Sequence, residues 1–156
     1  MPHITIEYSN NLADVHDVAA LVADVHAVAA GHPWVPLAGL RTRAIVREHF
    51  LVADGAPTNA FVAITVRVGP GRTDDEKQAF LDTILDGATI SVEGPDGSTT
   101  SLAIAWSIEI QEIDARWRVN RNRIRPPGDA SDVSRDTASP DVRNAGAQDA
   151  VSDGLT

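Results

Sequence analysis

The residue best suited to chemistry in this sequence is Pro2, at the head of the alternating stretch Met1-Pro2-His3-Ile4-Thr5-Ile6-Glu7-Tyr8. If the initiator methionine is removed, as is usual before a small second residue, Pro2 becomes a free secondary amine. A mostly apolar pocket disfavours the protonated amine, and nearby cations act in the same direction, so the pKa falls toward neutrality. Such an amine could remove and return a proton at physiological pH. Pro2 is therefore the first candidate for a catalytic residue.

Three arginines are candidates for binding an anion. Arg41 and Arg72 stand at the ends of a predicted strand and of a turn, where binding residues collect, and Arg43 lies two residues along the same strand face as Arg41. A guanidinium binds a carboxylate through two parallel hydrogen bonds and stabilises negative charge on a nearby oxygen. The turn Gly69-Pro70-Gly71 would present Arg72 at a helix N-terminus, where anions are favoured. These positions indicate a small anionic ligand.

Other kinds of site have little support in the sequence. Of the five histidines, His16 and His26 are ten residues apart and the others are scattered, so none has the spacing of a zinc motif. Gly69-Pro70-Gly71 lacks the final glycine and the following acidic residue of a dinucleotide fingerprint. We therefore expect no metal and no dinucleotide.

Composition narrows the class of protein further. The 156 residues, 43% of them hydrophobic, suit one domain, and no apolar run approaches the roughly 20 residues of a membrane helix. Polar residues interrupt the N-terminus, so we expect no signal peptide, and the lack of cysteine makes cytoplasm the default compartment. A net charge of −9 argues against nucleic acid as a partner.

Hydrophobic periodicity predicts two similar halves, about 1–58 and 59–125, each a strand, a helix and a returning strand. The predicted strands cover about 3–8, 40–52, 60–68 and 102–113, and the predicted helices cover 14–30 and 74–85, with 87–101 as a loose connection. We expect strands 40–52 and 60–68 to pair as a hairpin. The four strands would form one layer beneath both helices, which is an α+β fold. Tryptophans 34, 106 and 117 are expected in the core or an interface, or lining the pocket.

The last segment has a different composition. Residues 126–156 contain six aspartates against two arginines and hardly any large apolar residue. Such a chain cannot bury enough apolar surface to offset its conformational entropy. We predict a domain over 1–125 and a disordered acidic tail over 126–156.

Several motifs together resemble one known family. Met1-Pro2-His3, Ala38-Gly39-Leu40-Arg41-Thr42-Arg43-Ala44, Ala53-Asp54-Gly55, Asn59-Ala60-Phe61-Val62 and Val68-Gly69-Pro70-Gly71-Arg72 occur in order and with compatible spacing. This pattern is similar to 5-carboxymethyl-2-hydroxymuconate isomerase, of the tautomerase superfamily, over roughly residues 2–123. The second half also resembles the short subunit of 4-oxalocrotonate tautomerase (4-OT).

The resemblance implies a cofactor-free homotrimer of tandem β-α-β repeats that converts a dienol to its conjugated ketone, in the breakdown of aromatic compounds. Pro2 matches the catalytic amine, Arg41 the arginine that binds a carboxylate from the second strand, and Arg72 the arginine after the Gly-Pro-Gly turn. Trp117-Arg118-Val119-Asn120 matches a divergent form of the family's aromatic-Lys-x-Asn segment. The implied substrate is a small dicarboxylate or tricarboxylate, with no nucleic acid or membrane partner.

Two other functions fit the same residues. One is a different reaction of an amino-terminal proline on this scaffold, such as decarboxylation or hydration of a small keto acid. The other is a ligand-binding protein that kept the fold and lost the activity. Replacement of Pro2 by alanine distinguishes enzyme from binder, because only an enzyme would lose a rate.

Overall fold

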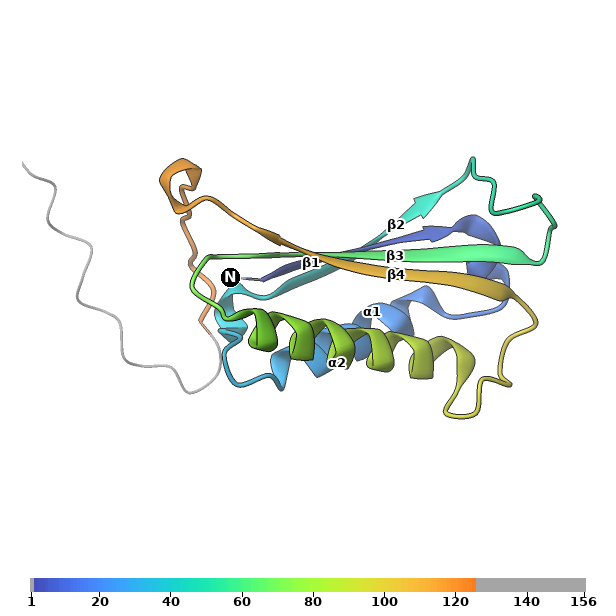
Figure 1. The fold of residues 1–156 in the computed structure, drawn as a ribbon, viewed down its shortest axis with the longest axis horizontal. Coiled ribbons are helices and arrows are strands. Elements are labelled where there is room, and N and C mark those ends of the chain that lie inside the picture. The colour runs from blue at the N-terminus through green and yellow to red at the C-terminus, as the bar shows by residue number, and fades with distance from the viewer. Residues whose placement is uncertain (1, 126–156) are drawn as a thin grey trace, which may run out of the picture. The chain divides into compact units, whose positions relative to one another are not determined.

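The computed structural model describes residues 2–125 (Figure 1). The tail predicted at 126–156 lies outside the described residues, and the domain boundary at 125 stays a prediction. No helix among the described residues is both long and apolar enough to cross a membrane.

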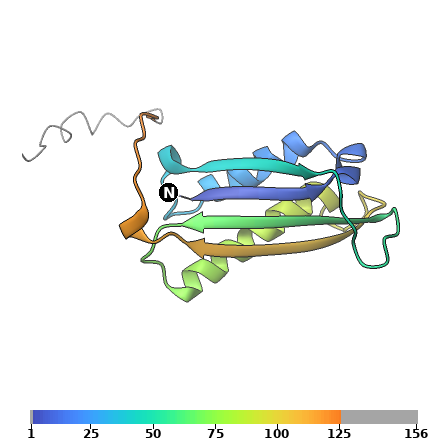
Figure 2. The ribbon, with the colours of Figure 1, turned by 90° about the horizontal axis from the view of Figure 1, so that it is seen from above.

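Four strands and two helices follow one another in the order β-α-β-β-α-β. The strands are β1 (His3–Ser9), β2 (Arg41–Arg47), β3 (Asn59–Val68) and β4 (Ala103–Glu112), the helices are α1 (Val18–Ala30) and α2 (Asp74–Glu93), and 3₁₀ turns cover Asn10–Asp14, Leu37–Gly39 and Ala115–Trp117. The sheet order is β2-β1-β3-β4, and both helices lie on one face (Figures 1 and 2). The prediction of an α+β tandem β-α-β fold, with two helices on one face of a four-stranded sheet, is confirmed.

The predicted hairpin between residues 40–52 and 60–68 is wrong. β2 instead pairs with β1 in parallel, and β3 pairs with the other edge of β1 in antiparallel fashion. A strand that returns after a helix lies parallel to the strand before that helix, so α1 brings β2 to β1. The Asp54-Gly55 turn does form, with Gly55 at φ +78°, but it belongs to a long connection that begins once β2 ends at Arg47.

Both helices differ from the predicted bounds. α1 starts at Val18 rather than at residue 14, because the Asp17 carboxylate caps it by accepting from the Ala19 N–H at 2.9 Å. α2 runs on to Glu93, eight residues past its predicted end. Gly87 does not end α2 because it serves helix packing: a Cβ there would lie 2.9 Å from Val28 Cγ2 of α1.

The core lies between the sheet and the helices. It includes Ile4 and Ile6 of β1, Leu21 and Val25 of α1, Val62, Ile64, Val66 and Val68 of β3, and Phe80 and Ile84 of α2. On the other face of the sheet, which neither helix covers, most side chains are polar or small and at least partly exposed: His3, Thr5 and Glu7 of β1, Arg41 and Arg43 of β2, Ala63, Thr65 and Arg67 of β3, and Ala105 and Ser107 of β4. Ile45 of β2 and Phe61 of β3 are larger apolar side chains on the same face. We call this surface the open face. Because strand side chains alternate, the neighbours Pro2 and His3 belong to opposite faces.

Residues 113–125, which we call the strap, run across one end of the sheet (Figure 2). The Ile113 N–H donates to Val68 O at 2.7 Å, and Asn122 Nδ2 donates to Ala38 O at 2.7 Å. The strap therefore extends from the end of β4 to the turn before β2, past the start of β1. It carries five arginines, at 116, 118, 121, 123 and 125, and one acidic residue, Asp114, which pairs with Arg116 at 2.7 Å.

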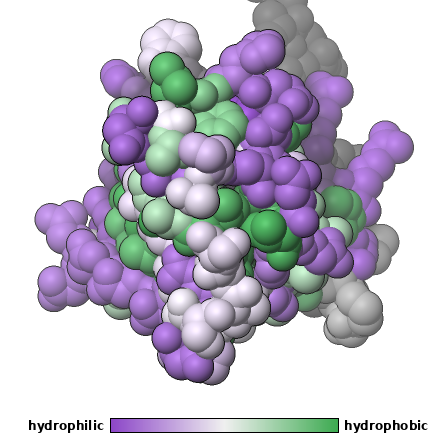
Figure 3. Space-filling model, turned by 90° about the vertical axis from the view of Figure 1, so that its right-hand side faces the viewer, coloured by the Kyte–Doolittle hydropathy of each residue, from purple (hydrophilic) through white to green (hydrophobic). Residues whose placement is uncertain are grey.

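The opposite end of the sheet differs in character. Its surface mixes hydrophobic and hydrophilic patches (Figure 3). Leu51, in the connection after β2, is 87% exposed there.

Candidate active site

A cavity of about 250 Å³ opens beside Pro2, which is buried at the start of β1. We call it the Pro2 cavity. Its lining comes from the segment before β2, the end of β3 with its turn, and the strap, and consists of Pro2, Trp34, Pro36, Val68, Gly69, Pro70, Arg72 and Arg118. Most of these residues are apolar, and the two charged ones are arginines. This is the environment in which an amine loses its proton most easily.

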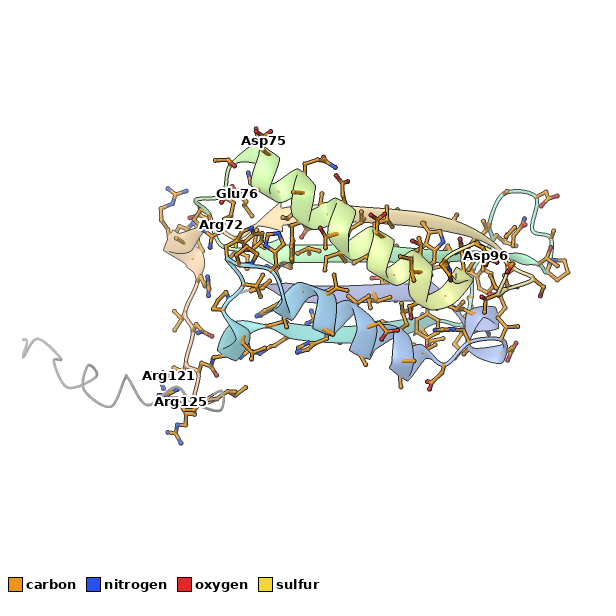
Figure 4. The ribbon with its side chains drawn as sticks, turned by 90° about the horizontal axis from the view of Figure 1, so that it is seen from below. Arg72, Asp75, Glu76, Asp96, Arg121 and Arg125 are labelled. Carbon is orange, nitrogen blue, oxygen red and sulfur yellow. The ribbon has the colours of Figure 1, made fainter. Side chains whose placement is uncertain are left out.

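Arg72 is positioned in this cavity by the start of α2. Gly71 takes a positive φ of +98°, and Thr73 caps the helix: Thr73 Oγ1 accepts from the Glu76 N–H at 3.2 Å, while the Glu76 carboxylate accepts from the Thr73 N–H at 2.8 Å. That backbone hydrogen bond is the main reason why the pKa of Glu76 lies below its ordinary value, with a smaller contribution from Arg72. Figure 4 shows Arg72 beside Glu76 at this end of α2.

An aromatic cluster fixes Arg72 from its other side. The guanidinium carbon lies 4.9 Å from the centre of the Trp34 ring, and Trp34 packs on Phe80 with ring centres 4.6 Å apart. Arg72 Nε and Trp34 Nε1 are buried donors with no hydrogen-bond partner among the described residues. Arg72 also makes no salt bridge within that part of the chain. Two buried donors without partners at a cavity wall suit an anionic ligand.

The structure places Arg41 and Arg43 on the open face, away from this cavity. The Arg41 N–H donates to Pro2 O at 3.2 Å, but its side chain turns toward His3: Nη1 lies 3.4 Å from His3 Nε2 and donates to Gly39 O at 3.1 Å. Arg43 is exposed opposite Thr5. Of the four predicted site residues, Pro2 and Arg72 share the Pro2 cavity, while Arg41 and Arg43 stand one strand away on the other face.

A second cavity, of about 240 Å³, lies on the His3 side of the sheet. We call it the His3 cavity. It is lined by His3, Arg67, Ile113, Trp117, Arg118, Val119 and Asn120. Burial lowers the pKa of His3, and Arg41, Arg43 and Arg67 lower it further. Arg118 lines both cavities.

Sequence reasoning did not single out His3, Arg67 or Arg118 as site residues. A signal for two of them was present: His3 and Arg67 sit at alternating positions on the outward faces of their strands, and the two are register partners. Among the described residues, no group of three or more histidine, cysteine or acidic side chains is arranged to hold a metal ion.

Solved structures share this architecture. A 5-carboxymethyl-2-hydroxymuconate isomerase from Deinococcus radiodurans R1 matches with 26% identity and a TM-score of 0.68, over 78% of this chain and 89% of that one. A fused 4-OT symmetric trimer matches with 17% identity and a TM-score of 0.56, over 76% of this chain and 93% of that one, which shows the fold alone. The architecture is the tautomerase fold.

The sequence comparisons specify the family within this fold. The family model for 5-carboxymethyl-2-hydroxymuconate isomerase matches residues 2–127. A 5-carboxymethyl-2-hydroxymuconate Delta-isomerase from Escherichia coli is 27% identical over 124 residues, which are 80% of this chain and 96% of that protein. The chain belongs to the 5-carboxymethyl-2-hydroxymuconate isomerase family, and the expectation of an isomerase of the tautomerase superfamily is confirmed.

Proposed function

We propose that the protein converts a 2-hydroxymuconate-type dienol to its conjugated keto isomer, with Pro2 as the base, in the breakdown of aromatic compounds. The observation that carries this proposal is the burial of Pro2 in a cavity whose charged lining residues, within 2–125, are Arg72 and Arg118. An amine in apolar surroundings next to cations has a depressed pKa, so it is partly unprotonated near neutral pH.

The reaction needs only one base that moves a proton. The Pro2 amine takes the proton of the substrate's enol hydroxyl and returns it to carbon, while the double bonds shift to give the conjugated ketone. No atom is gained or lost, and the amine is regenerated. Negative charge collects on the dienolate oxygen between the two steps, and a nearby guanidinium stabilises it.

Arg72 is the proposed partner for a substrate carboxylate in the Pro2 cavity. Its guanidinium makes no salt bridge among residues 2–125, and Trp34 and the cap of α2 hold it in place. Arg41, with Arg43 beside it, is proposed to attract substrate carboxylates from the open face. Arg41 also supports Pro2 through their shared backbone hydrogen bond.

The test is ultraviolet-monitored ketonisation of 5-carboxymethyl-2-hydroxymuconate by tag-free protein whose methionine loss is confirmed by intact mass. We expect turnover that falls as the pH drops through the pKa of the amine. Protein that retains Met1 is the matched control and should be inactive, because the nitrogen of an acylated proline is an amide. A rate no higher than that of buffer would overturn the proposed reaction and direct the search to other keto acids or to binding.

We further propose that the protein is a homotrimer. The open face has small side chains such as Ala63, Thr65 and Ala105, which no helix covers, and a fused 4-OT of the same fold is a symmetric trimer. Sedimentation equilibrium should give three times the 16.6 kDa mass of one chain. A monomer mass at micromolar concentration would refute this assembly.

A further inference from the structure

Two guanidiniums line the His3 cavity, that of Arg67, which is exposed, and that of Arg118, which is half-buried. Within residues 2–125, neither guanidinium makes a hydrogen bond or salt bridge, and no acidic side chain lines the cavity. Two other arginines are paired with acids: Arg47 with Glu7 at 2.7 Å, and Arg116 with Asp114 at 2.7 Å. Unpaired guanidiniums that converge on one cavity indicate an anionic ligand.

His3 also contributes to the electrostatics of the His3 cavity. Its imidazole faces the same cavity, and burial together with Arg41, Arg43 and Arg67 lowers its pKa. The imidazole is thereby kept neutral, so the positive charge in the cavity belongs to Arg67 and Arg118. An anion bound here would weaken the repulsion between these arginines and a protonated imidazole.

Arg118 connects this cavity to the Pro2 cavity, because it lines both. Gly69 allows the close approach of Arg118 to the turn after β3: a Cβ at Gly69 would lie 3.3 Å from Arg118 Nη1. One side chain of the strap thus lines both the cavity that holds the base and the cavity that holds the unpaired cations.

Apart from Asn120, the remaining lining of the His3 cavity is apolar. Trp117 and Val119 are 84% and 92% exposed, and Ile113 is half-buried beside them. Apolar side chains around two guanidiniums suit a carboxylate attached to a hydrocarbon segment better than a fully hydrated inorganic anion.

We propose that the His3 cavity is a second carboxylate subsite. The ligand is a small dicarboxylate that places one carboxylate at Arg72 in the Pro2 cavity and the other between Arg67 and Arg118. The inference rests on the proposed function for the identity of the substrate, but its test measures binding alone.

The test compares adipate with hexanoate, six-carbon acids that have two carboxylates and one. Each is titrated by calorimetry into protein lacking Met1, at fixed pH and ionic strength. We expect adipate to bind at least tenfold more tightly than hexanoate. Arg67→Gln should weaken adipate about tenfold, as expected from the loss of one charge-assisted contact, and should leave hexanoate within twofold.

Three matched variants make the result specific. Arg72→Gln should weaken both acids, because each places a carboxylate in the Pro2 cavity. Arg118→Gln should weaken adipate at least as much as Arg67→Gln does. Arg125→Gln should weaken neither, because Arg125 lies on the strap outside both cavities and, among the described residues, donates only to the Asn122 and Ile124 carbonyls (Figure 4). Thermal melts confirm that each variant is folded.

An NMR titration provides an independent readout of the same subsite. Adipate should shift the His3 imidazole and Trp117 indole resonances and raise the pKa of His3, whereas hexanoate should not. Equal affinities for the two acids, or an Arg67→Gln protein with unchanged preference for adipate, would overturn the subsite. Since Pro2→Ala protein can be used throughout, a failed ketonisation assay would refute the proposed reaction without affecting this result.

Discussion

Pro2 and His3 are neighbours in sequence but belong to two different environments. The Pro2 cavity is walled by groups that the core holds in place: Val68 is buried, and Trp34 packs on buried Phe80. The His3 cavity is walled by the open face and by the strap, whose Trp117 is 84% exposed. Because a strand turns successive side chains to opposite faces, one strand end supplies a sheltered base on one side and a cationic surface on the open face. The first environment suits proton transfer and the second suits selection of the ligand.

The largest expected effect is on the rate of catalysis, and it should differ between Pro2 and His3. Pro2→Ala should lower kcat by about 10²- to 10⁴-fold, the usual contribution of a general base. His3→Ala should change KM more than kcat, because His3 contacts the ligand and moves no proton. Steady-state ketonisation kinetics of both variants show whether each substitution changes kcat or KM. A His3→Ala protein with the larger loss in kcat would reverse the roles of the two sides.

The free energy of unfolding should depend more on residues behind the Pro2 cavity than on residues of the strap. Phe80→Ala should lower the free energy of unfolding by about 3–5 kcal/mol, because it leaves a cavity under Trp34 in a fully buried site. Trp117→Ala should change it by no more than about 0.5 kcal/mol, since most of its ring is already in water. Urea unfolding of both variants checks this, and comparable losses would mean that the strap is as well packed as the core.

Substitutions of Arg72 test whether the Pro2 cavity needs the planar geometry of a guanidinium as well as its positive charge. Arg72→Ala should lower kcat/KM about 100-fold, because one guanidinium that stabilises the dienolate and its carboxylate is lost. Arg72→Lys should recover only part of that loss, since an ammonium cannot form two parallel hydrogen bonds or stack in the same way on Trp34. Full recovery by lysine would show that only the charge matters.

The cap of α2 gives a smaller and sharper test. Thr73→Ala and Asp17→Ala each remove one helix cap, and each should cost about 1 kcal/mol of stability. Only Thr73→Ala should also lower kcat/KM, because α2 begins directly after Arg72 whereas α1 begins far from the site. If both variants retained full activity, the cap would have no part in placing Arg72.

The smallest expected effect is on pH dependence. The folded protein holds the pKa of His3 below the unfolded value near 6.5, by burial and by the cations Arg41, Arg43 and Arg67, with Arg118 across the cavity. The unfolded chain therefore binds more protons just below pH 6.5, so the free energy of unfolding falls as the pH drops through that range. His3→Gln should flatten this part of the profile from denaturant melts. An unchanged profile would assign the pH dependence to other groups.

The sequence predicted the elements better than their pairing. Alternation in β1 and β3 is a local signal, and it predicted both strands. The pairing of β2 with β1 depends on the crossover through α1, which local turn signals such as Asp54-Gly55 do not encode. The prediction ended α2 before Gly87, but Gly87 lies within α2 and packs against Val28 of a different helix, a contact that the local sequence does not encode.

In the candidate site, too, residues in local motifs were predicted better than contacts between distant segments. Pro2 and Arg72 were recognised because each stands in a motif, and the structure brings them to one cavity. The role of Trp34 in holding Arg72 was not predictable, since it arises from packing on Phe80 across the molecule. Arg118 was recognised only as part of a divergent motif, because its position depends on the hydrogen bonds that anchor both ends of the strap.

The strap also gives the molecule a local potential of opposite sign to its net charge. With a total of −9, the protein as a whole repels an anionic substrate, yet five arginines and one aspartate run past the start of β1. At 0.1 M salt, charges are screened beyond about 10 Å, so an approaching anion is governed by these arginines and hardly by distant carboxylates. Dilution of the salt would extend the reach of both fields. The association rate of the substrate would then depend on two opposing terms, repulsion by the net negative charge of the protein and attraction by the arginines of the strap.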